Sequence, residues 1–76
     1  MTRDETLKIM AVLKATYPNF YKDMTRRDAE GVVALWTDMF SEDSYNAVAA
    51  AVKAFIASDS KGFPPVVGQV KQRVME

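Results

Sequence analysis

Hydrophobic side chains recur along this 76-residue chain at steps of three and four residues, the spacing of one face of an α-helix. Thr2 and Glu5 have the spacing of a capping box at the start of the first such segment, and Thr25 is the expected N-cap of the second. Pro18 ends the first segment, because the residue before a proline is disfavoured in the helical conformation. The pattern predicts a single all-α domain, a compact bundle of four helices at about residues 3–16, 26–40, 43–57 and 65–75.

An aromatic-rich segment, residues 17–24, connects the first two predicted helices and contains Tyr17, Phe20 and Tyr21. We expect it to form a short helical or turn element whose rings cover the core, since clustered aromatic rings are unfavourable in water. Two other interpretations remain open: a protein-binding patch, and a surface that stacks single-stranded nucleic acid beside the cations that follow. Nearby aspartates dilute that positive charge. Tyr17 and Tyr21 are therefore candidate partner-binding residues.

The segment Phe63-Pro64-Pro65 precedes the last predicted helix. Pro65 suits the first position of a helix, where the missing N–H would have no intrahelical partner in any case, and Phe63 is expected to pack onto the core. The alternative is a polyproline ligand for a partner, although two prolines make a short motif for that kind of recognition. Pro64 and Pro65 are therefore also candidate partner-binding residues.

The hydrophobic core is predicted on the apolar faces of these helices. Trp36 falls in the periodic series of the second helix, which favours a buried position; the alternative is an anchor in a protein interface, where tryptophan is enriched. The predicted core comprises Leu7, Met10, Leu13, Phe20, Val33, Trp36, Phe40, Val48, Val52, Phe55, Phe63 and Val70.

The composition argues against catalysis. The chain has no cysteine and no histidine, so it has no Ser-His-Asp triad, no Cys-His dyad, no ordinary zinc site and no disulfide. Its carboxylates stand in no recognisable acid–base or magnesium-binding context, and it lacks a phosphate-binding glycine loop. We therefore predict no catalytic, cofactor-binding or metal-binding residue, and a protein that is not an enzyme.

The charge balance and the hydropathy bear on the choice of partner. Ten Lys and Arg residues against ten Asp and Glu give a net charge of zero, which argues against general attraction to nucleic acid or anionic lipid. No apolar run approaches the roughly 20 residues that span a bilayer, so a cytoplasmic protein that binds no membrane is expected. The alternative function is a small helix-turn-helix DNA-binding or regulatory domain of a phage. Glu42 and Asp43 at the start of its recognition helix would repel phosphates, so no direct nucleic-acid contact is expected.

Three groups of residues together resemble a known family. They are Thr2–Thr6 leading to Tyr17–Tyr21, then Ala34–Trp36 with Met39 and Phe40, and finally Val52–Ala57 followed by Lys61–Pro65 and Gly68–Lys71. Their order and spacing are similar to those of the N-terminal domain of the phage replicative helicase loader/inhibitor family, from phages of Gram-positive bacteria. The resemblance covers nearly the whole chain, and the Phe-Pro-Pro segment followed by Gly-Gln is its most distinctive part.

The resemblance implies a non-enzymatic adaptor in phage DNA replication, located in the cytoplasm of the bacterial host. Members of the family bind the hexameric replicative helicase, restrain its ATPase and unwinding activities, and deliver it to the origin-bound replisome organiser. The family's main helicase contact lies in a flexible C-terminal segment that has no counterpart in these 76 residues, so no helicase-binding residue is carried over. Two roles for the folded domain remain open, contact with the organiser and the holding together of an assembly.

Overall fold

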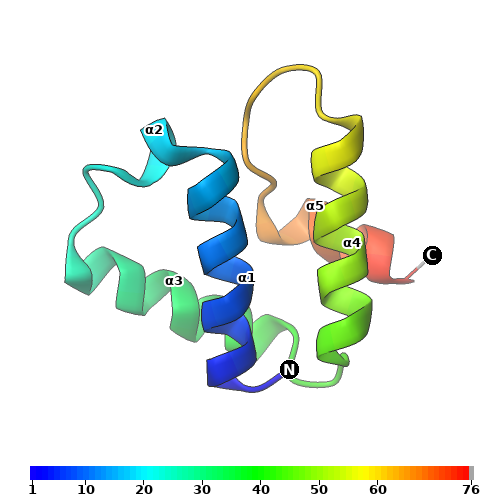
Figure 1. Ribbon diagram of the computed structural model, residues 1–76. Coiled ribbons are helices and arrows are strands. Elements are labelled where there is room, and N and C mark those ends of the chain that lie inside the picture. The colour runs from blue at the N-terminus through cyan, green and yellow to red at the C-terminus, as the bar shows by residue number, and fades with distance from the viewer. Residues whose placement is uncertain (76) are drawn as a thin grey trace.

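The computed structural model describes residues 1–75, and every regular element in that range is a helix. The helices are α1 (Arg3–Thr16), α2 (Pro18–Tyr21), α3 (Arg26–Met39), α4 (Tyr45–Ser58) and α5 (Val67–Met75) (Figure 1). The all-α prediction is confirmed, and α2 is the short aromatic-rich element expected between the first two long helices.

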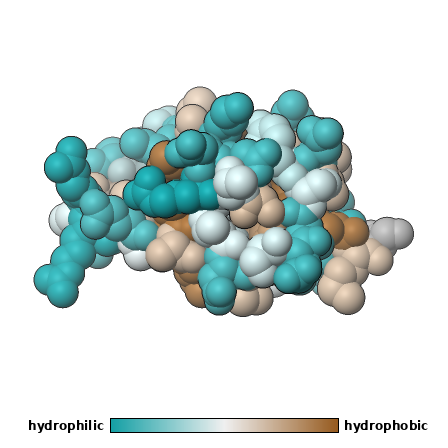
Figure 2. All heavy atoms as spheres, turned by 90° about the horizontal axis from the view of Figure 1, so that it is seen from below, coloured by the Kyte–Doolittle hydropathy of each residue, from teal (hydrophilic) through white to brown (hydrophobic). Residues whose placement is uncertain are grey.

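The four longer helices form two layers. α1 and α4 lie side by side, and α3 and α5 cross behind them (Figure 1). α1 packs against α3 and α4, and α4 packs against α5. The face seen from below, near the N-terminal ends of α1 and α4, is mostly hydrophilic or neutral, with hydrophobic side chains only in small separate areas (Figure 2).

Side-chain caps begin three of these helices. Thr2 and Glu5 form the complete capping box, in which the Thr2 hydroxyl accepts from the Glu5 N–H and the Glu5 carboxylate accepts from the Thr2 N–H. The Thr25 hydroxyl accepts from the Asp28 N–H at 3.1 Å. The Ser44 hydroxyl accepts from the Ala47 N–H at 3.1 Å, so α4 begins at Tyr45 and not at residue 43 as expected.

The last helix also begins later than the expected residue 65. The Val66 N–H donates to Oε1 of Gln69 at 2.9 Å, and the Gln69 N–H donates back to the Val66 carbonyl at 3.0 Å. This reciprocal pair sets the start of α5 at Val67. The prediction that Pro65 takes the first helical position is therefore wrong. Pro65 is instead buried in the irregular segment before the helix.

Most of the predicted core is buried. The buried hydrophobic residues are Ile9, Met10, Leu13, Tyr17, Val33, Trp36, Phe40, Val48, Ala49, Ala51, Val52 and Val70. Three predicted core residues are exposed instead: Leu7 (42%), Phe20 (50%) and Phe63 (57%). Phe55 is only partly buried, with the Arg73 guanidinium 5.7 Å above its ring.

The exposed residues have physical explanations. The buried line along α1 runs through Thr6, Ile9, Met10 and Leu13, and Leu7 lies one residue, or about 100°, away from Thr6 around the helix. Phe20 and Phe63 pack on each other edge to face, with ring centroids 5.3 Å apart. Each ring thereby covers part of the other at the surface without entering the core.

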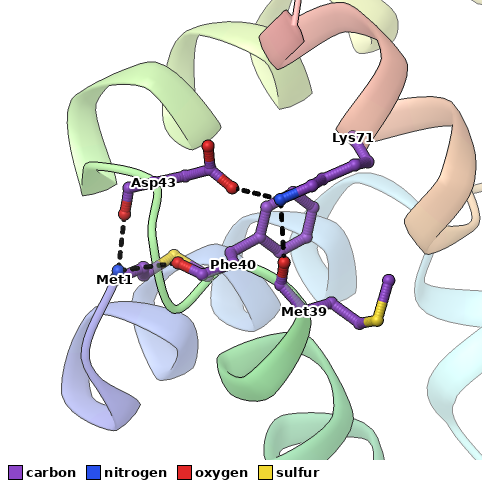
Figure 3. A network of polar contacts seen from close by, with 5 residues as sticks. All are labelled: Met1, Met39, Phe40, Asp43 and Lys71. Carbon is purple, nitrogen blue, oxygen red and sulfur yellow. Dashed lines mark hydrogen bonds and ion pairs between the residues drawn. The ribbon is translucent and has the colours of Figure 1, made fainter.

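A polar network joins the beginning of the chain to α5 (Figure 3). The Met1 amine donates to the Phe40 carbonyl at 2.9 Å and to the Asp43 carbonyl at 2.5 Å. Lys71 Nζ donates to the Met39 carbonyl at 3.0 Å and pairs with Asp43 Oδ2 at 2.6 Å. Two cationic groups thus satisfy carbonyls at the C-terminal end of α3, where the helix dipole also favours positive charge.

Candidate functional site

Three of the four candidate partner-binding residues line one apolar groove. Tyr21 comes from α2, and Pro64 and Pro65 come from the segment that precedes α5. The remaining lining residues are Met10 of α1, Val32, Leu35 and Trp36 of α3, and Val66, Val67 and Gly68. We call this the proline groove. Its volume of about 490 Å³ falls within the roughly 300–1,000 Å³ of typical ligand pockets.

Tyr17 is the candidate that the structure does not place in this groove. Its ring is buried at 6% exposure, and its hydroxyl donates to Asp59 Oδ2 at 2.8 Å. Burial, followed by the hydrogen bond and the negative charge of Asp59, raises the pKa of the Tyr17 hydroxyl to about 12. Tyr17 therefore connects the end of α1 to the loop after α4 and presents little surface to a partner.

Asp59 organises that loop. Its Oδ1 accepts from the N–H groups of Lys61 at 3.0 Å and Gly62 at 3.2 Å, and Gly62 has φ = 76°, a conformation that glycine adopts without a steric penalty. The hydrogen bond from Tyr17, together with these backbone N–H groups, lowers the pKa of the Asp59 carboxyl. The tyrosine and the aspartate together hold the loop that carries Pro64 and Pro65 to the groove.

The proline groove has no charged side chain among its described lining residues. Tyr21 is its one titratable group, and burial raises the pKa of its hydroxyl. Leu35 and Val66 stand exposed at its edges, at 53% and 64%. A groove of this kind can take up apolar side chains of another protein.

Leu35 and Val66 are binding candidates that the sequence reasoning missed. On α3, Leu35 lies outside the buried face that contains Val33 and Trp36. An apolar residue outside the periodic stripe of its own helix is the signal that identifies such a position. For Val66 no comparable signal exists, because it lies in an irregular segment.

The arrangement of α3 and α4 does not favour the helix-turn-helix alternative. α3 packs mainly on α1, and α4 packs mainly on α1 and α5, whereas a helix-turn-helix packs its two helices on each other. Glu42 and Asp43 lie just before α4, and Lys53 is the one cation within it. The exposed Glu42 carboxylate in that position would repel phosphate oxygens, whereas the Asp43 carboxylate is paired with Lys71.

Within residues 1–75 no group of three or more Asp or Glu side chains is placed to hold a metal ion. None of the helices described is long and apolar enough to cross a membrane.

Comparison with known proteins identifies a family. Residues 1–71 match the family model for the N-terminal domain of a phage helicase loader/inhibitor. No curated protein and no solved structure matches the chain. The match covers α1 to α4 and the first part of α5. The chain therefore belongs to this family, the N-terminal domains of phage helicase loader/inhibitors.

Proposed function

We propose that this chain is the folded part of a non-enzymatic adaptor that acts in phage DNA replication, in the cytoplasm of the bacterial host. The adaptor binds the hexameric replicative helicase, restrains its ATPase and unwinding activities, and delivers it to the origin-bound replisome organiser. The family match over residues 1–71 is the observation that carries this proposal. The main helicase contact lies in a C-terminal segment beyond the residues of this domain.

The folded domain contacts the organiser through the proline groove. The support is physical: the groove is apolar, its described lining has no charged side chain, and Leu35 and Val66 stand exposed at its edges. Such a surface binds by contact and release of water, which suits an adaptor without chemistry of its own. Tyr21, Pro64 and Pro65 are the sequence candidates that take part.

Binding to the helicase tests the adaptor function. The full-length protein is mixed with the phage replicative helicase in the presence of nucleotide, and complex formation and ATP hydrolysis are measured. A stable complex with reduced ATPase activity is expected. The absence of any complex at micromolar concentrations would contradict the proposal.

Binding to the organiser tests the groove. Leu35→Asp and Val66→Asp place a carboxylate at the edge of the apolar groove and are expected to weaken binding of the organiser about tenfold or more, because the charge loses water on contact. Met75→Asp changes an exposed apolar residue (77%) outside the groove lining and serves as the matched control. Equal binding by all three variants would show that the organiser does not use the proline groove.

A further inference from the structure

A second groove lies between α1 and the N-terminal part of α3, and the proposed function does not use it. Its lining includes Leu7, Met10, Ala11 and Lys14 of α1, and its volume is about 570 Å³. The opposite wall is formed by α3, through Arg26, Ala29 and Val33. The rest of the lining consists of Tyr21, Met24 and Thr25. We call this the α1–α3 groove. It shares Met10 and Tyr21 with the proline groove.

The spacing of the lining residues gives the groove its shape. Leu7, Met10, Ala11 and Lys14 stand at positions i, i+3, i+4 and i+7 of α1, so they form one face two turns long. On α3, Arg26, Ala29 and Val33 stand at positions i, i+3 and i+7. Each wall is therefore a helical face about 10 Å long, at 1.5 Å of rise per residue. A groove between two such faces has the form that accepts an amphipathic helix in helix-in-groove recognition.

The charge of the groove selects the kind of helix. Lys14 and Arg26 are its charged lining residues, and no carboxylate occurs in the lining as far as residues 1–75 are concerned. Neither cation forms an ion pair in that range, where Lys71–Asp43 is the one salt bridge. The N-terminal turn of α3 opens onto the same groove, and Asp28 in that turn offsets part of the positive charge of the helix dipole there. An apolar floor beneath two cations that form no ion pair is complementary to apolar side chains flanked by carboxylates.

We propose that the α1–α3 groove binds an acidic amphipathic helix of a partner protein. The apolar residues of that helix, at positions i, i+3 or i+4 and i+7, lie on Met10, Met24 and Val33. Its Asp or Glu residues pair with Lys14 and Arg26. The proposal depends only on the shape and charge of this groove, so it stands or falls independently of whether the chain binds a helicase or an organiser.

Methionine methyl groups provide the test. The chain is labelled with ¹³C-methyl methionine and titrated with a designed helical peptide of about five turns that has a leucine face flanked by glutamates. Met10 and Met24 line the groove, whereas Met39 and Met75 do not. The expected result is a shift of the Met24 and Met10 signals, with Met39 and Met75 unchanged. The same peptide with lysine in place of each glutamate is expected to bind at least tenfold more weakly.

Charge-reversal variants test whether Lys14 and Arg26 contribute to binding of the peptide. The double variant Lys14→Glu/Arg26→Glu is expected to weaken binding of the glutamate peptide about tenfold or more. The double variant Lys53→Glu/Lys61→Glu makes the same change in net charge at exposed sites outside the groove lining, and it is expected to leave binding unchanged. Circular dichroism checks that both variants are folded. For the unaltered chain, binding is expected to weaken as the salt concentration rises, because exposed charges are screened.

Three results would overturn the proposal. Equal affinity for the glutamate and lysine peptides would remove the role of charge. An oligothymidine that shifts Met24 at lower concentration than the peptide would identify the groove as a nucleic-acid site. Concentration-dependent shifts of Met24 without peptide, abolished by Lys14→Glu/Arg26→Glu, would show that a second copy of the chain is the occupant.

Discussion

The two grooves share Met10 and Tyr21 but differ in what lines the rest of them. The proline groove has an irregular segment as one wall and no charged lining residue. The α1–α3 groove has helices on both sides and two cations. The difference is instructive, because an uncharged groove selects a partner by shape alone, whereas a charged one also selects by the sign of the partner's charge and responds to salt.

The largest expected effect comes from the floor of the proline groove. Trp36 is only 5% exposed and packs against Phe40 with ring centroids 5.6 Å apart. Trp36→Ala is expected to lower the free energy of unfolding by about 3–5 kcal/mol, because it leaves a large cavity. That is a large part of the roughly 5–15 kcal/mol typical of a domain. Urea denaturation measures it.

Leu35→Ala is the matched control for this prediction. Leu35 lines the same groove at 53% exposure, so its removal is expected to cost much less, within about 1 kcal/mol. Similar losses for the two variants would mean that Trp36 does not form the structural floor, and that the groove is not a preformed feature of the fold.

The next largest effect concerns the hydrogen bond between Tyr17 and Asp59, which holds the loop that forms one wall of the proline groove. The stability that this contact provides depends on pH. The folded state raises the pKa of the Tyr17 hydroxyl to about 12, so Tyr17 stays protonated where the unfolded chain begins to ionise near pH 10. The contribution of Tyr17 is fully present below pH 10 and is lost as the pH rises toward 12. Tyr17→Phe is expected to lower stability at neutral pH and to flatten this alkaline decrease in thermal denaturation.

The Asp59 carboxyl in the same contact makes stability depend on pH in the opposite direction, and it does so at acidic pH. Because folding lowers the pKa of the Asp59 carboxyl below its ordinary value of 3.8, its contribution is present above that value and is lost as the pH falls further. Tyr17→Phe is expected to reduce this acidic loss too, while the Met24 methyl signal stays unchanged because Tyr17 does not line the α1–α3 groove. A displaced Met24 signal would show that the two grooves are mechanically coupled.

A smaller effect is expected at a polar contact between α1 and α3, outside the lining of the α1–α3 groove. Thr6 is fully buried on α1, and its hydroxyl lies 2.8 Å from that of Thr37 on α3. Thr6→Val keeps the shape but removes this hydrogen bond and the one that the Thr6 hydroxyl donates to the Thr2 carbonyl at 2.9 Å, for an expected loss of about 0.5–1.5 kcal/mol for each bond in urea denaturation. Thr16→Val removes only an exposed contact to the Val12 carbonyl and is expected to cost less. The reverse order would contradict the role assigned to the Thr6–Thr37 contact.

The smallest effect on stability is expected at the cations themselves. Lys14→Gln and Arg26→Gln are each expected to change the free energy of unfolding by less than about 0.5 kcal/mol, since both side chains are exposed and form no ion pair within residues 1–75. A loss above about 1 kcal/mol in thermal denaturation would assign these residues to the fold and not to partner binding. That outcome would remove the main difference between the two grooves.

The sequence by itself determined the local structure. The three- and four-residue spacing predicted the long helices, and Thr2 with Glu5 and Thr25 marked the starts of two of them, because a cap and its target lie within one turn of each other. The candidate residues Tyr21, Pro64 and Pro65 were also proposed from local signals, and their role stays a prediction. Their assembly into one groove was not predictable, because nothing in the spacing states how α2 and the segment before α5 approach each other.

Only the tertiary structure decided which apolar residues are covered. Tyr17 and Phe20 lie three residues apart in the same aromatic segment, yet Tyr17 is buried on Asp59 and Phe20 pairs with Phe63 at the surface. Periodicity identifies the apolar face of a helix, but burial depends on neighbours that are distant in sequence. For the same reason, both grooves and the charges that distinguish them arise from how the helices pack and not from any one segment.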